Sequence, residues 1–135
     1  MRLPHKAHLA IVDGTRFVLM RNDGSPDEPK LSEQAKPDLD PTNFSAGVKH
    51  QDDAGQRTGA TDLNELAHAA AVADWLNRAA LDKTIETLAI AADPKTLGEM
   101  RRHYHKSLEA IIIGEEAKTL TGETTERIEK TLLSA

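Results

Sequence analysis

The sequence predicts an α/β fold with a mixed sheet of about five strands and helices on both faces. Two observations carry this prediction. Two apolar, β-branched-rich runs near the N-terminus are joined by Asp13-Gly14, and helical and strand patterns then alternate along the chain. A hairpin followed by such alternation gives a sheet that is antiparallel at its start and parallel later. The predicted order of elements is β-β-β-α-β-α-β-α.

The hairpin strands are expected at His8 to Val12 and Thr15 to Arg21, because Asp-Gly favours a two-residue turn between strands. Apolar residues occupy both faces of each run, so both strands are expected inside a sheet that is covered on both sides. A short third strand is predicted at Lys30 to Gln34. The polar stretch 35–60 follows and is predicted to be a long loop, a kind of segment that is usually functional or unfolded until it binds.

A long helix is predicted after this loop, with Asp62 as its N-cap and Glu65 closing a capping box. Small and apolar residues recur at helical spacing and mark one buried face. They are Leu66, Ala69, Ala70, Ala73, Leu76 and Ala80. Trp75 lies off the centre of this face and is read as ordinary core, with a partner interface as the alternative.

The C-terminal half continues the alternation. Asp93-Pro94 supplies an N-cap and a proline in the first turn, and Thr124 supplies a second N-cap before Ile128 and Leu132, which are one turn apart. The predicted elements are a strand at Thr87 to Ala92, a helix from Asp93 to about His105, a strand at Leu108 to Gly114 and a terminal helix. This is the order of elements in ribonuclease H-like folds.

Composition limits the class of protein. The chain has 135 residues, 39% hydrophobic content and a formal net charge of -5, which predict one domain over 1–135 and argue against a surface that binds nucleic acid all round. Cysteine is absent, which excludes disulfides and thiolate metal sites. Neither an apolar leader nor a membrane-spanning run is found, so we expect a cytoplasmic protein without membrane contact.

Three sets of residues invite a functional interpretation. Asp13, Glu65 and Asp93 fit a metal-dependent nuclease loosely, but each already has a predicted turn or cap to make. The histidines lack the spacing of a ligand set, so we expect no metal and no cofactor. The basic cluster 101–106, with Arg101, Arg102 and Lys106, suits a helix C-terminus, and a phosphate or acidic partner is the alternative.

The loop also contains Ala54-Gly55-Gln56. Glycine allows backbone conformations that are closed to other residues, and a glutamine amide both donates and accepts hydrogen bonds. A Gly-Gln tip can therefore orient a water molecule or an ester carbonyl.

Several segments together resemble the bacterial "protein required for attachment to host cells" family. They are Leu3-Pro4-His5, the run from Ala10 to Arg16 with Arg21-Asn22, the helix from Leu63 to Leu76, the run from Ala91 to Arg101, and Lys118-Thr119-Leu120-Thr121. That family is related to the central domain of the archaeo-eukaryotic peptide-chain release factors, which has a mixed α/β fold. In those factors a Gly-Gly-Gln loop before a long helix enters the ribosome and helps hydrolyse the peptidyl-tRNA ester.

The resemblance implies that Gln56 orients the water or the carbonyl and that Gly55 provides backbone freedom, with Ala54 in the place of the first glycine. It implies a ribosome or a tRNA as partner, contacted by Gly55, Gln56, Arg57 and the basic cluster. The leading hypothesis is a host-attachment-family protein that acts as a non-catalytic cytoplasmic binding module. The alternatives are hydrolysis of a peptidyl-tRNA ester centred on Gln56, and a protein partner bound through Trp75.

Overall fold

The computed structural model describes residues 1–37, 39 and 57–133, with the backbone alone for 57–62. Its sheet has five strands in the order β3-β2-β1-β4-β5. Strand β1 pairs antiparallel with β2 and parallel with β4, and β4 pairs parallel with β5. The predicted mixed sheet is therefore confirmed.

The strands follow the apolar runs of the sequence. Their bounds are β1 His8–Val12, β2 Phe17–Asn22, β3 Leu31–Glu33, β4 Leu88–Ala92 and β5 Ile112–Ala117. Strand β4 is buried along its whole length, because helices cover the sheet on both sides. The last strand begins four residues later than predicted, since Leu108 instead lies buried in the short helix α4.

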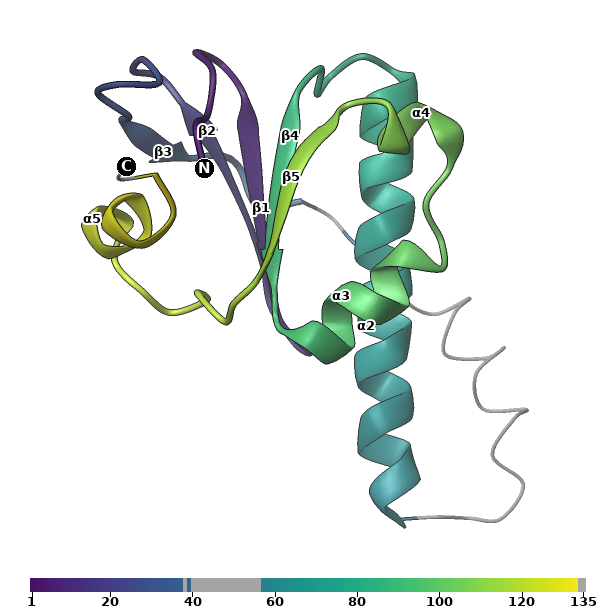
Figure 1. The fold of residues 1–135 in the computed structure, drawn as a ribbon. Coiled ribbons are helices and arrows are strands. Elements are labelled where there is room, and N and C mark those ends of the chain that lie inside the picture. The colour runs from purple at the N-terminus through teal and green to yellow at the C-terminus, as the bar shows by residue number, and fades with distance from the viewer. Residues whose placement is uncertain (38, 40–56, 134–135) are drawn as a thin grey trace.

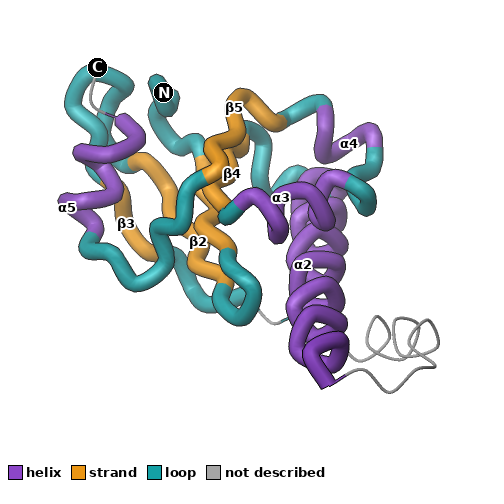
Figure 2. The backbone as a smooth tube through the Cα atoms, turned by 60° about the horizontal axis from the view of Figure 1, so that its bottom comes forward, coloured by secondary structure: helices purple, strands orange, loops and turns teal. Residues whose placement is uncertain are grey.

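Helices α2 (Arg57–Leu81), α3 (Pro94–Arg101) and α4 (Lys106–Glu109) lie on one face of the sheet. Helix α5 (Thr125–Ile128) and the π-helical turn η1 (Glu129–Leu133) lie on the other (Figure 1). Figure 2 shows the same two layers from below, with α3 lying beside α2. The predicted placement of helices on both faces is confirmed.

Each face of the sheet has its own apolar cluster. The first joins Ala10, Val12 and Ile90 of the sheet to the alanine-rich side of α2, and the second joins Leu9 and Ile11 to the C-terminal helices. Small side chains on α2 let its backbone approach the sheet closely. The alternating orientation of strand residues explains why both sides of each strand had to be apolar.

The long helix corrects the sequence prediction. Helix α2 begins at Arg57, so Asp62 lies inside it and does not cap it, and the capping box with Glu65 is wrong. The loop predicted over 35–60 overlaps this helix from residue 57 onward, and its residues 38 and 40–56 lie outside the described residues. The first turns of α2 extend past α3 and past the sheet (Figure 1).

Two N-caps are confirmed. The Asp93 carboxylate accepts from the Thr96 amide at 3.1 Å, and the Thr124 hydroxyl accepts from the Arg127 amide at 3.2 Å. Helix α3 ends at Arg101, earlier than the predicted His105. Asn77 of α2 explains this end, because its buried amide donates to the carbonyl of His103 and accepts from the amide of His105.

Candidate functional site

The turn between β1 and β2 is built around Asp13. The Asp13 amide donates to the Arg16 carbonyl at 3.0 Å, so Gly14 and Thr15 occupy the two-residue turn, one position later than predicted. The Asp13 carboxylate accepts from the amides of Thr15 and Arg16, at 2.8 and 2.6 Å. It also accepts from the Arg16 side chain and from the hydroxyl of Thr121, which lies beyond β5. The turn is thereby fixed to a segment more than 100 residues away in sequence.

These contacts decide the charge of Asp13. Partial burial raises the pKa of the carboxyl, but the hydrogen bonds from Thr121, Thr15 and Arg16 outweigh burial and lower the pKa to about 2. The carboxylate therefore stays ionised throughout the physiological range. A group with this pKa and these donors stabilises a turn and is a poor general base.

The three acidic residues considered for a nuclease come from neighbouring elements. Asp13 and Asp93 directly follow β1 and β4, whose last residues pair with each other. Glu65 of α2 lies against Gly14, and its carboxylate is 3.7 Å from the ammonium of Lys95. Each carboxylate thus has a structural partner. Among the described residues, no three histidine, aspartate or glutamate side chains are grouped to hold a metal ion.

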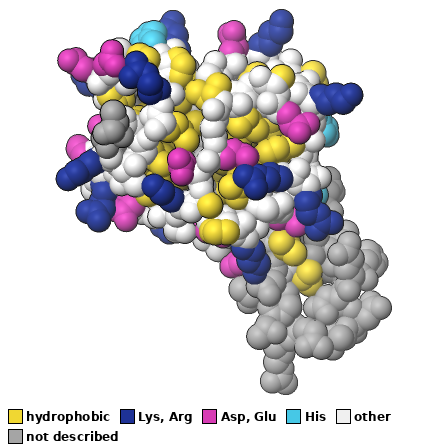
Figure 3. Space-filling model, viewed as in Figure 1, with side chains coloured by type: hydrophobic (Ala, Val, Ile, Leu, Met, Phe, Trp, Pro, Cys, Tyr) yellow, Lys and Arg dark blue, Asp and Glu magenta, His cyan; other side chains and the backbone are white. Residues whose placement is uncertain are grey.

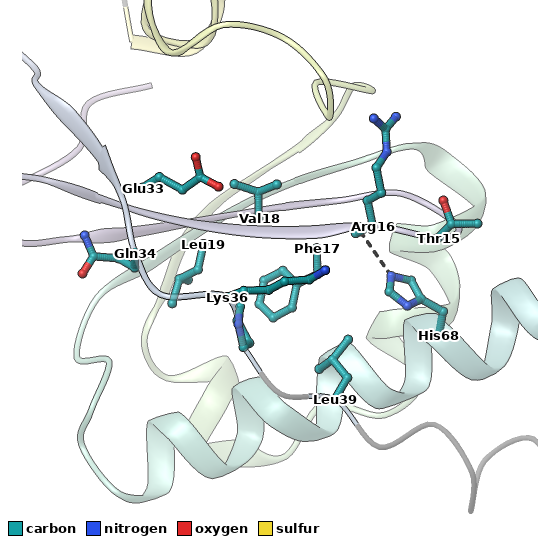
Figure 4. Close-up of a pocket in the computed structure, with 11 residues that line it drawn as sticks. Thr15, Arg16, Phe17, Val18, Leu19, Glu33, Gln34, Lys36, Leu39 and His68 are labelled. Atoms are coloured by element: carbon teal, nitrogen blue, oxygen red, sulfur yellow. Dashed lines mark hydrogen bonds between the residues drawn. The ribbon is translucent and has the colours of Figure 1, made fainter.

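A groove of about 780 Å³ lies between β2, the segment after β3 and helix α2 (Figure 4). Phe17, Leu19 and Leu39 provide apolar lining, while polar lining comes from Gln34, Lys36, His68 and other side chains. Concave sites with an apolar lining and a few polar groups are the commonest form of ligand site. This groove is therefore a candidate ligand site.

The groove is open because β3 is short. Strand β3 pairs only with Met20, Arg21 and Asn22, and the Gln34 amide donates to the Leu19 carbonyl, so among the described residues no strand lies beside Phe17 and Val18 on that side. Such an exposed strand edge can receive an extended peptide backbone.

The groove offers binding surface but few reactive groups. His68 of α2 points toward β2, and its Nε2 donates to the Arg16 carbonyl at 3.1 Å (Figure 4). Deeper in, Phe17 and the half-buried Trp75 meet edge to face with ring centroids 5.6 Å apart. Trp75 therefore packs against the core, as the simpler interpretation of the sequence predicted.

The basic cluster is paired with acids. The Arg101 guanidinium donates to Glu115 of β5 at 2.9 Å, and Arg102 donates to Glu99 at 3.2 Å. The arginine is more exposed to solvent than its acidic partner: the Arg102 side chain is 75% exposed, whereas that of Glu99 is 13% exposed. Lys106 lies in α4, after the turn, and is exposed. Outward-facing guanidinium groups remain able to meet an anion.

Glu115 also holds Tyr104. The Tyr104 hydroxyl donates to Glu115 at 2.9 Å, and burial, followed by the charge of Glu115, raises the pKa of Tyr104. Arg101 and Tyr104 thus share one carboxylate, which fastens the end of α3 to β5. Figure 3 shows basic and acidic side chains interspersed on this side of the molecule, without a single basic field.

The remaining predicted site residues lie at the loop. Gly55 and Gln56 fall outside the described residues, and Arg57 is the first residue of α2, described by its backbone alone. The groove and the Asp13 network were not predicted from sequence. Their members come from separate segments, and no spacing in the sequence brings Thr121 to Asp13 or His68 to Arg16.

Comparison with known families agrees with this architecture. The chain matches the family described as bacterial archaeo-eukaryotic release factor family 12 over residues 6–132. No curated protein matches it. No helix within the described residues is both long and apolar enough to cross a membrane. The match covers nearly the whole chain, and the chain therefore belongs to bacterial archaeo-eukaryotic release factor family 12.

Proposed function

We propose that this protein is a release-factor-like binding module that associates with a ribosome or a tRNA and has no catalysis of its own. Its support begins with the family match, which spans the complete sheet and all helices up to Leu132. The groove adds support for binding over chemistry, because His68, the histidine of its lining, already donates to a backbone carbonyl.

One observation carries the proposal. Helix α2 has 25 residues, begins directly after Gln56, and projects past the sheet at that end (Figure 1). A Gly-Gln pair immediately before the projecting end of a long helix matches the arrangement that the release-factor resemblance implies. A rigid helix holds the residue that follows such a pair at a defined distance from the globular body.

Charged groups support a second contact. Arg101, Arg102 and Lys106 are exposed, and the two arginines keep N–H groups that their carboxylate partners do not use. Phosphate contacts of this kind weaken steeply as salt concentration rises. Association with a ribosome should therefore be strongest at low salt.

The test is copurification of ribosomes and tRNA with the tagged protein from native cytosol at low salt. We expect binding that falls at least about fivefold in Gln56→Ala and in Arg101→Ala, a loss of about 1 kcal/mol each. Arg127→Ala is the matched control, because Arg127 is also an exposed arginine paired with a glutamate, but on α5. Absence of any association at low salt would contradict the proposal.

The second candidate is hydrolysis of a peptidyl-tRNA ester centred on Gln56. It is favoured by Gly55-Gln56 standing immediately before α2. Ala54 limits the loop, because alanine disfavours the positive φ values that glycine adopts freely. If the loop is catalytic, Ala54→Gly should raise turnover.

Turnover of a defined peptidyl-tRNA measures this directly. The hydrolytic hypothesis predicts loss of turnover in Gln56→Ala and retention in Gln51→Ala, which makes the same change five residues earlier in the same polar stretch. Turnover that survives Gln56→Ala unchanged removes Gln56 from the mechanism.

A role in host attachment stays a prediction from sequence resemblance. A cytoplasmic protein that acts on translation can alter attachment indirectly, through the proteins that a cell produces.

A protein partner that binds through Trp75 is the third hypothesis. It is opposed by the packing of Trp75 on Phe17, and the test is whether Trp75→Phe abolishes capture of a protein while leaving ribosome binding intact.

A further inference from the structure

A second cavity, of about 400 Å³, lies at the end of β1 that is opposite to the Asp13 turn. Four of its lining side chains are basic: His5, Lys6, His8 and Arg21. The hydroxyls of Thr84 and Thr87, from the segment between α2 and β4, line it as well, and Glu86 contributes one carboxylate. On a chain whose net charge is -5, this is a local concentration of basic side chains.

The cavity is built from rigid parts. Asn22 is fully buried; its amide donates to the carbonyl of Leu3 at 2.7 Å and its oxygen accepts from the amide of Lys30 at 2.9 Å. The Lys6 amide donates to the Asn22 carbonyl at 2.6 Å, which holds Lys6 in the left-handed region with φ of 69°. Non-glycine residues in that region are strained and cluster at functional sites.

The charges around the cavity are only partly matched. Arg21 donates through Nε to Asp23 at 2.7 Å, which leaves its terminal N–H groups available, and Asp23 also accepts from Ser32. Lys6 has no salt bridge to any described residue. Glu86 is the one acid among the lining residues, against the two charged donors Lys6 and Arg21.

His8 lies directly opposite Arg21 in the β1–β2 pair, so both side chains leave the same face of the sheet. Its Nδ1 is buried without a partner among the described residues, and Nε2 is not among the buried unpartnered atoms. Burial, followed by the charge of Arg21, lowers the pKa of His8 against an opposing effect of Asp23. The neutral ring keeps its proton on Nε2, because an unpaired buried N–H is costly, and it therefore offers a donor there.

We propose that this cavity binds a phosphate group, held by the ammonium of Lys6, the guanidinium of Arg21, the Nε2–H of His8 and the threonine hydroxyls. Cations and hydroxyl donors that converge from several elements are the chemistry that recognises phosphate. The group can belong to a free phosphate or nucleotide or to an RNA backbone. The site is independent of Gln56 and of the proposed function.

The test follows the His8 ring by NMR during titration with inorganic phosphate, against chloride at equal ionic strength. We expect a saturable shift with phosphate only, together with a raised pKa of His8, because a bound anion favours the charged ring. Lys6→Asn should weaken binding about fivefold, since one exposed charge contact is lost. Asparagine tolerates the left-handed backbone, so the fold is kept.

Lys83→Asn is the matched control. Lys83 is the other lysine with positive φ, 63°, and it does not line the cavity. Equal effects of the two lysine variants, or identical His8 shifts in phosphate and chloride, would overturn the proposal. A second experiment replaces inorganic phosphate with AMP or with a short single-stranded RNA. If the RNA binds more tightly, the phosphate group that the cavity recognises belongs to an RNA backbone. If phosphate or AMP binds equally tightly or more tightly, the cavity recognises a free phosphate or nucleotide.

Discussion

At the scale of single residues, Asp13 explains why the β1–β2 turn has one conformation. Its two oxygens accept two backbone amides, the Arg16 side chain and the Thr121 hydroxyl. Only 14% of its side chain is exposed, so these donors replace most of its water. A carboxylate with this many donors contributes to stability through its charge.

The pH dependence has a definite sign. The folded pKa of Asp13, about 2, lies below the unfolded value of 3.8, so its contribution is complete above pH 4 and is lost as the pH falls toward 2. We expect Asp13→Asn to lower the free energy of unfolding by about 2 kcal/mol at neutral pH. The free energies of unfolding of the variant and the natural protein, measured with urea, should become equal near pH 2.

The control for Asp13 is Asp27→Asn. Asp27 also pairs with an arginine, Arg2, but its side chain is 79% exposed, so its loss should cost less than about 0.5 kcal/mol. The free energy of unfolding of Asp13→Asn is compared with that of the natural protein across pH. A difference that stays constant from neutral pH to pH 2 would show that the charge of Asp13 does not contribute to stability.

At the scale of elements, the loop between β2 and β3 is as constrained as the strands it joins. A side chain at Gly24 would come within 2.2 Å of the Glu28 carbonyl oxygen, and the Gly24 amide donates to the buried Asn22. His5 donates to the Gly24 carbonyl at 2.7 Å. The loop and the N-terminal turn are therefore joined by a hydrogen bond, and His5 also lines the cavity that we propose binds phosphate.

Gly24→Ala should lower the free energy of unfolding by about 2–4 kcal/mol, because the contact is with backbone that cannot move aside. Gly98→Ala is the matched control in thermal or urea unfolding. Gly98 is exposed within α3 and faces open space, so alanine should raise stability by about 0.5–1 kcal/mol. Equal effects of the two variants would contradict this view of the loop.

Some of the strands and helices could be predicted from the sequence, and others could not. Strands β1, β3 and β4 and the Asp93 cap have local causes, apolar runs or a capping side chain, and those causes are visible in sequence. Helix α2 began earlier than predicted because extending an anchored helix costs little, even through Gly59. Strand β5 was misplaced because an edge strand tolerates Glu115 and Glu116, which break the apolar pattern.

At the scale of the whole molecule, the chain has two separated surfaces around one sheet. The groove borders the β2 strand and α2, and the basic cavity lies near the other end of α2, beside Thr84 and Thr87. Neither could be predicted from spacing, since each joins residues from at least three segments. The loop with Gly55-Gln56 was found from sequence because a dipeptide motif needs no tertiary contact to be recognised.

We propose that the segment before α2 contacts RNA of the translation machinery. The most direct measurement places a photo-crosslinking amino acid at position 56 in cells and sequences the captured RNA. We expect crosslinks to ribosomal RNA or tRNA at position 56 and none at position 123, which directly precedes Thr124, the N-cap of α5. Crosslinks to protein alone, or equal RNA capture at both positions, would contradict it.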